Sequence, residues 1–334
     1  MESIQNIYKC IGAKPHPQMS EDLIIQNEKV TKNQIANEDQ QQNNQPKQEQ
    51  DKGQYLLFQN RKVDYLAIKI LQLIVPFFNN FYALKFVNND LDEHVITQIL
   101  QLIQQNNHIN KLFFEWNVLD QRLKEVFIPH LANTNLEFLI LRSNQVNDNV
   151  LKLLCEQIKN NPNCQIKYIE LYNNTFTKEG LNYLGLLFES YHKIEYLGLA
   201  KNNIKSLDDV KEILTRVGKK ILTPEELSHY RDKEKERETL IAKATKQKRK
   251  INEDMLPYLE PLLQVAEGQF ALFKNGQVKM INLSLNYISE QDNDFLDKFL
   301  VNQNEEIQLV LLANNFEPKI KEKLKKKYKK NLQI

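Results

Sequence analysis

The chain has 334 residues, of which 41% are hydrophobic and 26% are charged, a composition typical of a globular protein with one or two domains. Its 45 basic and 43 acidic residues leave a formal net charge of +2, so no global field attracts the protein to nucleic acid or to an anionic membrane. The longest apolar stretch, Tyr65 to Phe78, contains Lys69, Gln72 and Pro76 and is too short and too polar to span a bilayer.

The N-terminal sequence MESIQNIYKC lacks a basic stretch followed by an apolar one, so it predicts no secretory signal. We therefore expect a cytoplasmic protein without membrane contact. Cys10, Cys155 and Cys164 form no close pair and are expected to be reduced thiols. Residues 1–53 are rich in Gln and Asn, and this tail is expected to be mostly disordered when alone.

From Gln54 onward, one phrase recurs along the chain. Leu84-x-Phe86-x-x-Asn89-x-Leu91 returns 28 positions later as Leu112-x-Phe114-x-x-Asn117-x-Leu119. The first apolar position of each phrase, called the marker below, is occupied by Leu56, Leu84, Leu112, Leu139, Ile169, Leu197, Ile281 and Leu309. Successive markers lie 28, 28, 27, 30, 28, 84 and 28 residues apart. A repeat of this length predicts a solenoid.

Each phrase predicts a short strand followed by a turn. Alternate residues of a strand point to one side, so the marker and the apolar residue two positions later are expected in the core. The asparagine five positions after the marker is expected to turn the chain and to bond backbone groups from repeat to repeat. Arg61 replaces this asparagine in the first repeat. Patterns such as Val95, Ile96, Ile99 and Ile103 predict a helix between strands.

These phrases resemble the leucine-rich repeat family. Their 28-residue length with a full helix is similar to the ribonuclease-inhibitor-type subclass, and NTFTKEGLNYL, from Asn174 to Leu184, is closest to that pattern. The resemblance covers Gln54 to Phe316 apart from one insertion. It implies an α/β horseshoe with parallel strands on the concave face and helices outside. Members of this subclass with charged helical insertions, found in motile cilia, are similar in organisation.

The phase of the repeat predicts the domain organisation. The 84-residue spacing equals one period of 28 plus 56 residues. We assign 1–53 to the tail, 54–218 to repeats one to five, 219–277 to a charged helical insertion, 278–317 to repeats six and seven, and 318–334 to a Lys-rich C-terminal capping helix. Eight strands can also be counted from Leu56. In that count the last two repeats would be the seventh and eighth, which we expect only if a degenerate repeat lies inside the insertion.

The insertion predicts a helical arm. Thr223-Pro224-Glu225-Glu226 is typical of a helix start, and the helix is expected to continue to about Lys250 with few apolar residues. Phe270, Leu272 and Phe273 are then expected to lead back to the sheet. The alternative is a tolerated loop expansion without a partner.

The C-terminal segment combines an apolar stripe with a basic surface. Ile320, Leu324 and Tyr328 lie at four-residue spacing and are expected to close the end of the solenoid. The basic tail comprises Lys323, Lys325, Lys326, Lys327, Lys329 and Lys330. It is interpreted as a solvated helix face, with an acidic protein surface as the alternative. Nucleic acid is disfavoured, since aromatic residues for base stacking are nearly absent from the segment.

Patterns typical of catalysis are missing from the sequence. The six histidines have no metal-ligand or triad spacing, and the eight glycines form no phosphate-binding loop. We therefore expect no enzyme activity, no catalytic residues, no metal and no cofactor.

The predicted concave face instead indicates binding of a protein partner. The candidate partner-binding residues are Phe113, Glu115, Trp116, Phe138, Arg142, Tyr168, Glu170, Tyr172 and Tyr196. Aromatic residues with interspersed charges are typical of interface hot spots. The alternative is that the aromatic side chains only pack on one another along the sheet.

The sequence therefore favours a non-enzymatic scaffold that binds protein partners in a multi-subunit assembly, with the axoneme as the setting that the resemblance implies. The alternative is a regulator of an enzyme, either an inhibitor or a protein similar to small-GTPase activators, for which Arg61 is the residue to test.

Overall fold

The structure is a computed structural model, and it describes residues 54–77, 81–131, 133–217, 219–246, 262–266, 268–273, 277–301 and 307–334, together with residues 256 and 259. The predicted tail, residues 1–53, lies outside the described residues, as does Cys10. Cys155 and Cys164 are free and buried.

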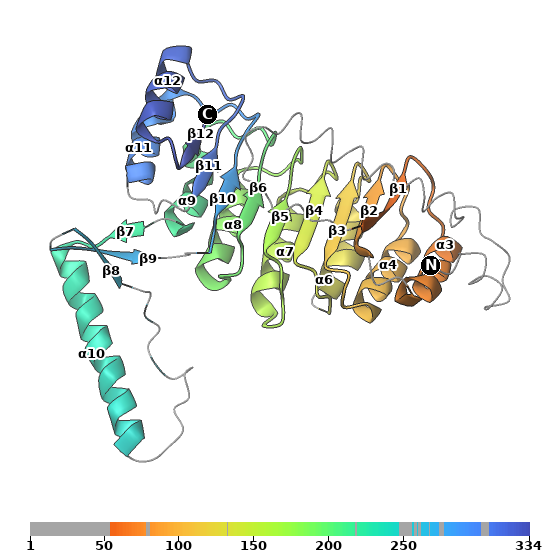
Figure 1. Cartoon of the computed structure of the whole chain (residues 1–334), viewed down its shortest axis with the longest axis horizontal. Coiled ribbons are helices and arrows are strands. Elements are labelled where there is room, and N and C mark those ends of the chain that lie inside the picture. The colour runs from red at the N-terminus through yellow and green to blue at the C-terminus, as the bar shows by residue number, and fades with distance from the viewer. Residues whose placement is uncertain are drawn as a thin grey trace.

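One nine-stranded parallel sheet runs the length of the molecule, with its strands in chain order (Figure 1). The strands are β1 (Gln54–Gln59), β2 (Phe81–Val87), β3 (Lys111–Glu115), β4 (Phe138–Arg142), β5 (Tyr168–Glu170), β6 (Tyr196–Gly198), β10 (Met280–Asn282), β11 (Gln308–Val310) and β12 (Leu332–Gln333). The repeat markers pair with one another from β1 to β11. This architecture confirms the predicted α/β leucine-rich repeat solenoid.

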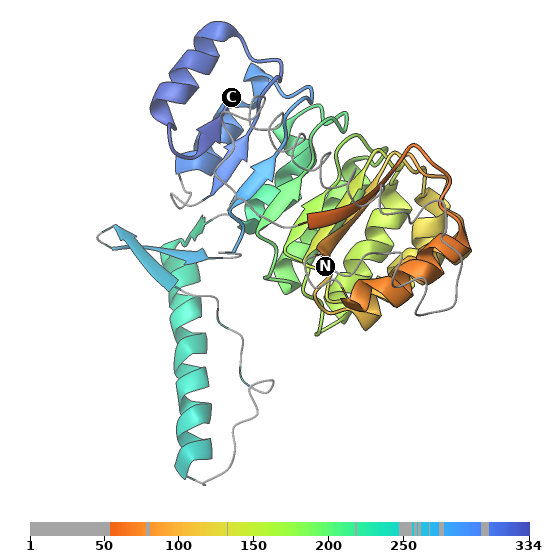
Figure 2. The ribbon, with the colours of Figure 1, turned by 45° about the vertical axis from the view of Figure 1, so that its right-hand side comes forward.

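Helices cover the outer side of the sheet (Figures 1 and 2). They are α3 (Tyr65–Ile74), α4 (Glu93–Gln105), α5 (Asp120–Arg122), α6 (Ile128–Leu131), α7 (Asp148–Asn160), α8 (Lys178–Ser190), α9 (Lys211–Val217) and α11 (Asn293–Val301). A π-helix, Leu123–Phe127, joins α5 to α6. Side-chain oxygens of Asp64, Asp92, Asn147 and Thr177 cap four of the helices, because the first backbone N–H groups of a helix lack partners within it.

A single apolar core lies between the sheet and these helices, and it contains the marker residues of every repeat. Phenylalanines occupy the second apolar position in the first three repeats. Phe58 stacks on Phe86 with ring centroids 5.2 Å apart, and Phe86 lies 5.8 Å from Phe114. The core is therefore continuous from repeat to repeat, as expected of a solenoid.

The asparagines form the predicted ladder in the core. Asn144 is fully buried, and its Oδ1 accepts a hydrogen bond from the Asn117 N–H at 3.0 Å. Its Nδ2 donates to the Phe114 carbonyl of the preceding repeat at 2.7 Å. Arg61 occupies the first rung, where its carbonyl accepts a hydrogen bond from Asn89 Nδ2 at 2.8 Å. Each rung thus satisfies backbone groups that the turn would otherwise leave buried without partners.

The strand order corrects the predicted repeat count. Six strands precede the insertion, so residues 54–218 hold six repeats rather than five, and β10 and β11 belong to the seventh and eighth. No hidden unit is needed, because β10 pairs directly with β6, with Ile281 opposite Leu197.

The insertion forms an arm with its own small sheet. It contains β7 (Lys219–Ile221), α10 (Pro224–Lys246), β8 (Leu262–Ala266) and β9 (Gln269–Phe273). The strands form a separate antiparallel sheet in the order β7-β9-β8. Phe270, Leu272 and Phe273 therefore lie in a second sheet that was not predicted, and β10 of the main sheet is the next strand along the chain. Helix α10 has no buried residue and projects away from the solenoid in both ribbon views (Figures 1 and 2).

The C-terminal end is closed by α12 (Pro318–Lys327) and by β12. Leu324 and Tyr328 are buried, and Ile320 is partly buried against the core. Strand β12 was not predicted, and it adds a ninth strand at the edge of the sheet. Among the described residues, every helix is too short or too polar to cross a membrane.

Candidate partner-binding surface

An aromatic column lies on the concave face, where three strands carry an aromatic residue immediately before the marker. The rings of Phe138 and Tyr168 stack with centroids 4.1 Å apart, and those of Tyr168 and Tyr196 lie 5.9 Å apart. All three side chains are half-buried. The Lys111 ammonium lies 4.4 Å from the Phe138 centroid, which extends the column by a cation–π contact. The rings pack on one another and still present part of their surface to solvent.

A row of charges borders this column on the side where the strands begin. Glu137 pairs with Lys167 at 3.0 Å, and Glu195 pairs with Lys279 at 2.7 Å. Because both pairs join residues of adjacent strands at the same strand position, their charges cancel locally. This border therefore contributes little net charge to the concave face.

Glu170 lies at the centre of the concave face, and it is 6% exposed. Its Oε2 accepts a hydrogen bond from the Tyr196 hydroxyl at 2.8 Å, and its Oε1 accepts one from the Tyr172 backbone N–H at 2.9 Å. Burial and the nearby Glu170 carboxylate raise the pKa of Tyr196 above its ordinary value, which keeps the hydroxyl protonated as a donor. Glu170, a predicted partner-binding residue, is thus occupied by hydrogen bonds within the protein.

Gly198 makes room for this carboxylate on the neighbouring strand. A Cβ atom at position 198 would lie 2.3 Å from Glu170 Oε2 and 2.5 Å from its Cδ. Real Cβ atoms do not approach other heavy atoms so closely, so a side chain here would displace Glu170. The absence of a side chain at position 198 therefore allows the Glu170 carboxylate to lie in its buried position on the concave face.

Arg142 connects the buried carboxylate to the exposed surface. One guanidinium nitrogen lies 3.6 Å from Glu170 Oε2, and the side chain is 46% exposed. Burial lowers the pKa of Arg142, but the Glu170 and Glu115 carboxylates raise it by more, and the net shift is upward. The guanidinium lies 5.8 Å from the Tyr172 centroid, and Lys201 Nζ lies 5.6 Å from the same centroid. The side chains of Arg142 and Lys201 thus both lie within cation–π distance of the Tyr172 ring.

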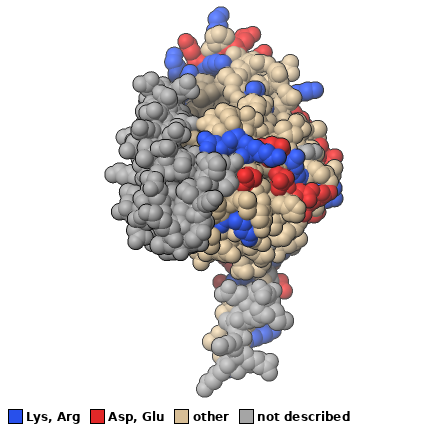
Figure 3. Space-filling model, turned by 90° about the vertical axis from the view of Figure 1, so that its right-hand side faces the viewer, with Lys and Arg blue, Asp and Glu red and all other residues tan. Residues whose placement is uncertain are grey.

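Phe113, Glu115 and Trp116 all come from β3 or its end. Lys85 pairs with Glu115 at 3.1 Å and lies 5.3 Å from the Phe113 centroid, with both charged side chains largely buried. Trp116 is 55% exposed. Seen from the N-terminal end of the solenoid, Lys and Arg side chains lie beside Asp and Glu side chains (Figure 3). This arrangement is consistent with the ion pairing on the first strands.

The residue before the ladder position adopts a left-handed backbone in every repeat. These residues are Asn60, Asn88, Trp116, Ser143, Asn173, Lys201, Leu285 and Ala313. Asparagine tolerates this conformation well, whereas tryptophan and leucine do so at a cost of roughly 1–2 kcal/mol per residue. The turn geometry therefore presents Trp116 and Leu285 outward at positions where polar residues fit more easily.

The basic tail lies apart from the concave aromatic residues. Helix α12 packs at the C-terminal end of the solenoid, several strands beyond the aromatic column (Figure 1). All six predicted lysines of this tail are exposed. Lys327 pairs with Asp297 of α11 at 2.8 Å, which attaches the capping helix to the last repeat. The nine concave residues and the six lysines therefore form two separate surfaces.

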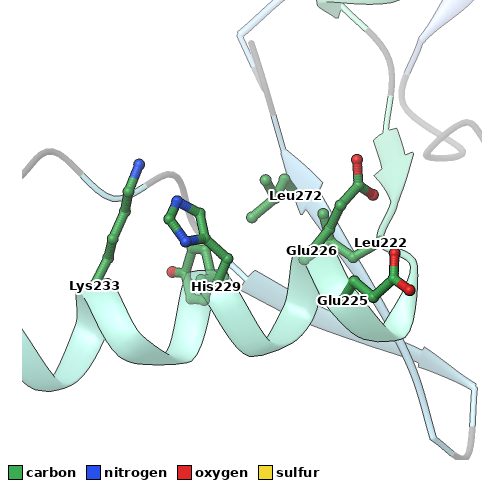
Figure 4. Close-up of a pocket in the computed structure, with 7 residues that line it drawn as sticks. Leu222, Glu225, Glu226, His229, Lys233 and Leu272 are labelled. Carbon is green, nitrogen blue, oxygen red and sulfur yellow. The ribbon is translucent and has the colours of Figure 1, made fainter.

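A pocket of 470 Å³ lies at the base of the arm. Glu225, Glu226, His229 and Lys233 of α10 line it together with Leu222 and Leu272 (Figure 4). Within the described residues, no group of three or more His, Cys, Asp or Glu side chains could hold a metal ion. The pocket combines carboxylates with a neighbouring ammonium and imidazole, a mixture that does not define one ligand.

Sequence reasoning missed the cations that contact the aromatic rings. Lys85 and Lys111 lie in the strand positions that face the concavity, and Lys201 follows β6. The signal was available, because Lys85 and Lys111 each stand opposite an aromatic residue of the next strand, and Lys201 lies near Tyr172, which follows the preceding strand. Gly198 was also a signal, since a glycine opposite Glu170 leaves space for a buried carboxylate.

The chain is similar to known proteins over part of its length. No protein-family model matches the chain. A 121-residue segment is 29% identical to the mouse protein "NACHT, LRR and PYD domains-containing protein 5", and it spans 34% of this chain and 10% of that protein. An internalin from Listeria monocytogenes matches with 12% identity and a TM-score of 0.34, over 74% of this chain and 52% of the internalin.

Proposed function

We propose that this protein is a non-enzymatic interaction scaffold that binds a protein partner through the concave face of its solenoid. The observation that supports this function best is the stacked and half-exposed column of Phe138, Tyr168 and Tyr196. Aromatic side chains held rigidly by stacking lose little conformational entropy on binding, and such residues dominate interface energetics.

Site-specific photo-crosslinking in cells tests this proposal. A benzoylphenylalanine residue replaces Tyr168 on the concave face, or Tyr183 of α8 as the control on the outer face. We expect a discrete partner protein to be crosslinked from position 168 and not from position 183. Equal labelling from both positions would contradict a concave binding surface.

We further propose that the partner belongs to a multi-subunit assembly, with the axoneme as the setting implied by the resemblance to ciliary proteins. The helix α10, which has no buried residue, supports a second contact, because most of its surface is available to neighbours. Crosslinkers placed on α10 and at position 168 should then label different subunits. A single soluble partner, labelled only from position 168, would instead favour the alternative function as a regulator of an enzyme. Loss of GTPase stimulation in the Arg61→Ala variant would then support a role similar to that of small-GTPase activators.

A further inference from the structure

The edge of the concave face where the strands end, called the loop edge here, carries an ordered pattern of side chains. It comprises Trp116, Arg142, Tyr172, Lys201 and Leu285. These residues lie at or just after the ends of successive strands, since β3, β4, β5, β6 and β10 are neighbours in that order. Backbone hydrogen bonds connect neighbouring turns along this edge: the Trp116 N–H donates to the Arg142 carbonyl at 3.0 Å, and the Lys201 N–H donates to the carbonyl of Ser284, the residue before Leu285, at 3.0 Å.

The centre of the loop edge has an excess of positive charge. The nearby acid Glu115 is paired with Lys85, and Glu170 is buried and already accepts two hydrogen bonds. Among the described residues, no carboxylate lies within ion-pair distance of Lys201. Arg142 has five N–H donors, and its ion-pair contact with Glu170 is as long as 3.6 Å. Both cations therefore retain the capacity to bind an anion.

The two ends of the loop edge are apolar and exposed. Trp116 is 55% exposed and the neighbouring Val118 is 51% exposed, while Leu285 and Tyr287 are 48% and 54% exposed. Trp116, Val118 and Leu285 have left-handed backbones, with φ of 58°, 47° and 56°. Large or β-branched residues are rare in this conformation, and their exposure means that packing within the protein does not explain them.

The spacing of these groups defines the shape of a ligand. Adjacent strands lie about 4.8 Å apart, so the four steps from Trp116 to Leu285 cover about 19 Å. An extended peptide covers this distance with about six residues at roughly 3.3 Å each. We infer that the loop edge binds an extended protein segment that is acidic in its middle and apolar at both ends. This inference rests on the proposed scaffold function and specifies the chemistry of its partner.

A carboxylate in the middle of the segment would approach Arg142 and Lys201 beside the ring of Tyr172. The apolar residues at its ends would cover Trp116 with Val118, and Leu285 with Tyr287. The apolar ends favour a protein segment over a nucleic acid, because a sugar–phosphate chain would place negative charge along the whole edge. Complementary charge in the middle would fix the position of the segment on the edge.

Peptide selection against the full chain tests this inference. A random dodecapeptide library displayed on phage is selected on the immobilised protein. We expect enriched sequences to contain Asp or Glu with apolar residues on both sides. Enrichment of sequences without acidic residues, enrichment of basic sequences, or no enrichment would overturn the inference. Tighter binding of a single-stranded oligonucleotide than of every selected peptide would also overturn it.

Charge-removing variants then locate the binding site of one selected peptide. Lys201→Gln and Arg142→Gln together should weaken its binding by about tenfold or more. The matched control, Lys323→Gln with Lys326→Gln, removes two exposed charges from α12 and should change affinity less than about twofold. Lys201→Gln alone, which leaves the contact between Arg142 and Glu170 in place, must show part of the loss. Equal effects of the two double variants would contradict the assignment.

One further variant separates this inference from the proposed function. Tyr168→Ser alters the aromatic column without changing the charges of the loop edge. One outcome is a set of selected peptides that lack acidic residues and lose affinity for the Tyr168→Ser variant. This outcome would support the proposed binding at the concave face and refute the inference that the loop edge binds an acidic segment. Acidic peptides that depend on Lys201 but ignore Tyr168→Ser would support the loop edge and count against the aromatic column. Thermal unfolding of each variant verifies that the fold is retained.

Discussion

At the centre of the concave face, the Glu170 carboxylate occupies the space that a side chain at position 198 would need. We expect Gly198→Ala to lower the free energy of unfolding by about 1–3 kcal/mol, because overpacking forces neighbouring atoms to move. Urea denaturation followed by circular dichroism measures the change. In a Glu170→Ala background the obstacle is absent, so the same substitution should cost clearly less. An equal cost in both backgrounds would show that the close approach is not the cause.

The asparagine ladder allows a second prediction at the scale of one residue. Asn144→Ala removes the acceptor of the Asn117 N–H and the donor to the Phe114 carbonyl, at a position with no solvent exposure. The expected loss of unfolding free energy is about 2–4 kcal/mol, since buried backbone groups are left without partners. Asn135→Ala, which removes an exposed side-chain contact to Asn107, serves as the control and should cost less than about 0.5 kcal/mol.

A pH-dependent contribution is expected at the C-terminal cap. Hydrogen bonds from Lys327 and then from Tyr328 hold the pKa of Asp297 below its ordinary value, which is about 3.9. The stabilisation is therefore present above this ordinary value and is lost as pH falls through the lower pKa of the folded state. In urea denaturation, Asp297→Asn should destabilise the protein at pH 6 and destabilise it less at pH 3. The effect should be small at both pH values, because the side chains of Lys327 and Asp297 are both exposed. A larger difference at pH 3 would refute this sign.

At the scale of elements, the phase of the apolar positions determined what could be predicted. The markers and asparagines recur because every repeat buries the same strand positions in the core and turns the chain at the same place. Strands β1 to β11 of the main sheet and the asparagine ladder were therefore predictable. Strand β12 has only two residues, Leu332 and Gln333, which is too short to show alternation. The small sheet of the arm pairs β7 with β9 across α10, and such distant pairing leaves no local pattern in Lys219–Ile221.

The arm itself should be dispensable for folding. Strands β6 and β10 pair directly across the insertion, so residues 219–276 can be replaced by one glycine while a five-residue connection from α9 to β10 is kept. We expect the free energy of unfolding to change by no more than about 1 kcal/mol, because loop length affects stability only weakly. Differential scanning calorimetry of both chains measures this. Loss of cooperative unfolding in the shortened chain would show that the arm is part of the solenoid core.

The candidate site could be predicted only in part, and the reason also lies in the elements. Strand alternation identified the residues that face the concavity, including Phe138, Tyr168 and Tyr196. Alternation does not show whether a facing residue remains accessible, however. Glu170 is covered because Tyr196 from the next strand hydrogen-bonds to it and Gly198 leaves space for it. Such contacts depend on the length and orientation of side chains on neighbouring strands. The alignment of strand positions in the sequence does not give this information.

For the whole molecule, the sequential order of strands means that each repeat contacts mainly its neighbours. Stability in such a solenoid is approximately a sum of repeat and interface terms. The two ends therefore matter differently from the middle, because an end repeat exposes one side of its core. At the C-terminal end, α12 and β12 cover the last full repeat with the buried residues Leu324, Tyr328, Leu332 and Ile334.

Removal of residues 318–334 tests this one-dimensional organisation. Without Leu324 and Tyr328, the apolar sides of α11 in the seventh repeat and of β11 in the eighth repeat are exposed to water. Amide hydrogen exchange should then accelerate by at least about tenfold in β11 and α11 while β3 to β5 keep their protection, since the disturbance decays from repeat to repeat. Mass spectrometry of the full and shortened chains locates the change. Uniform acceleration throughout the sheet would instead mean that the solenoid unfolds as one cooperative unit.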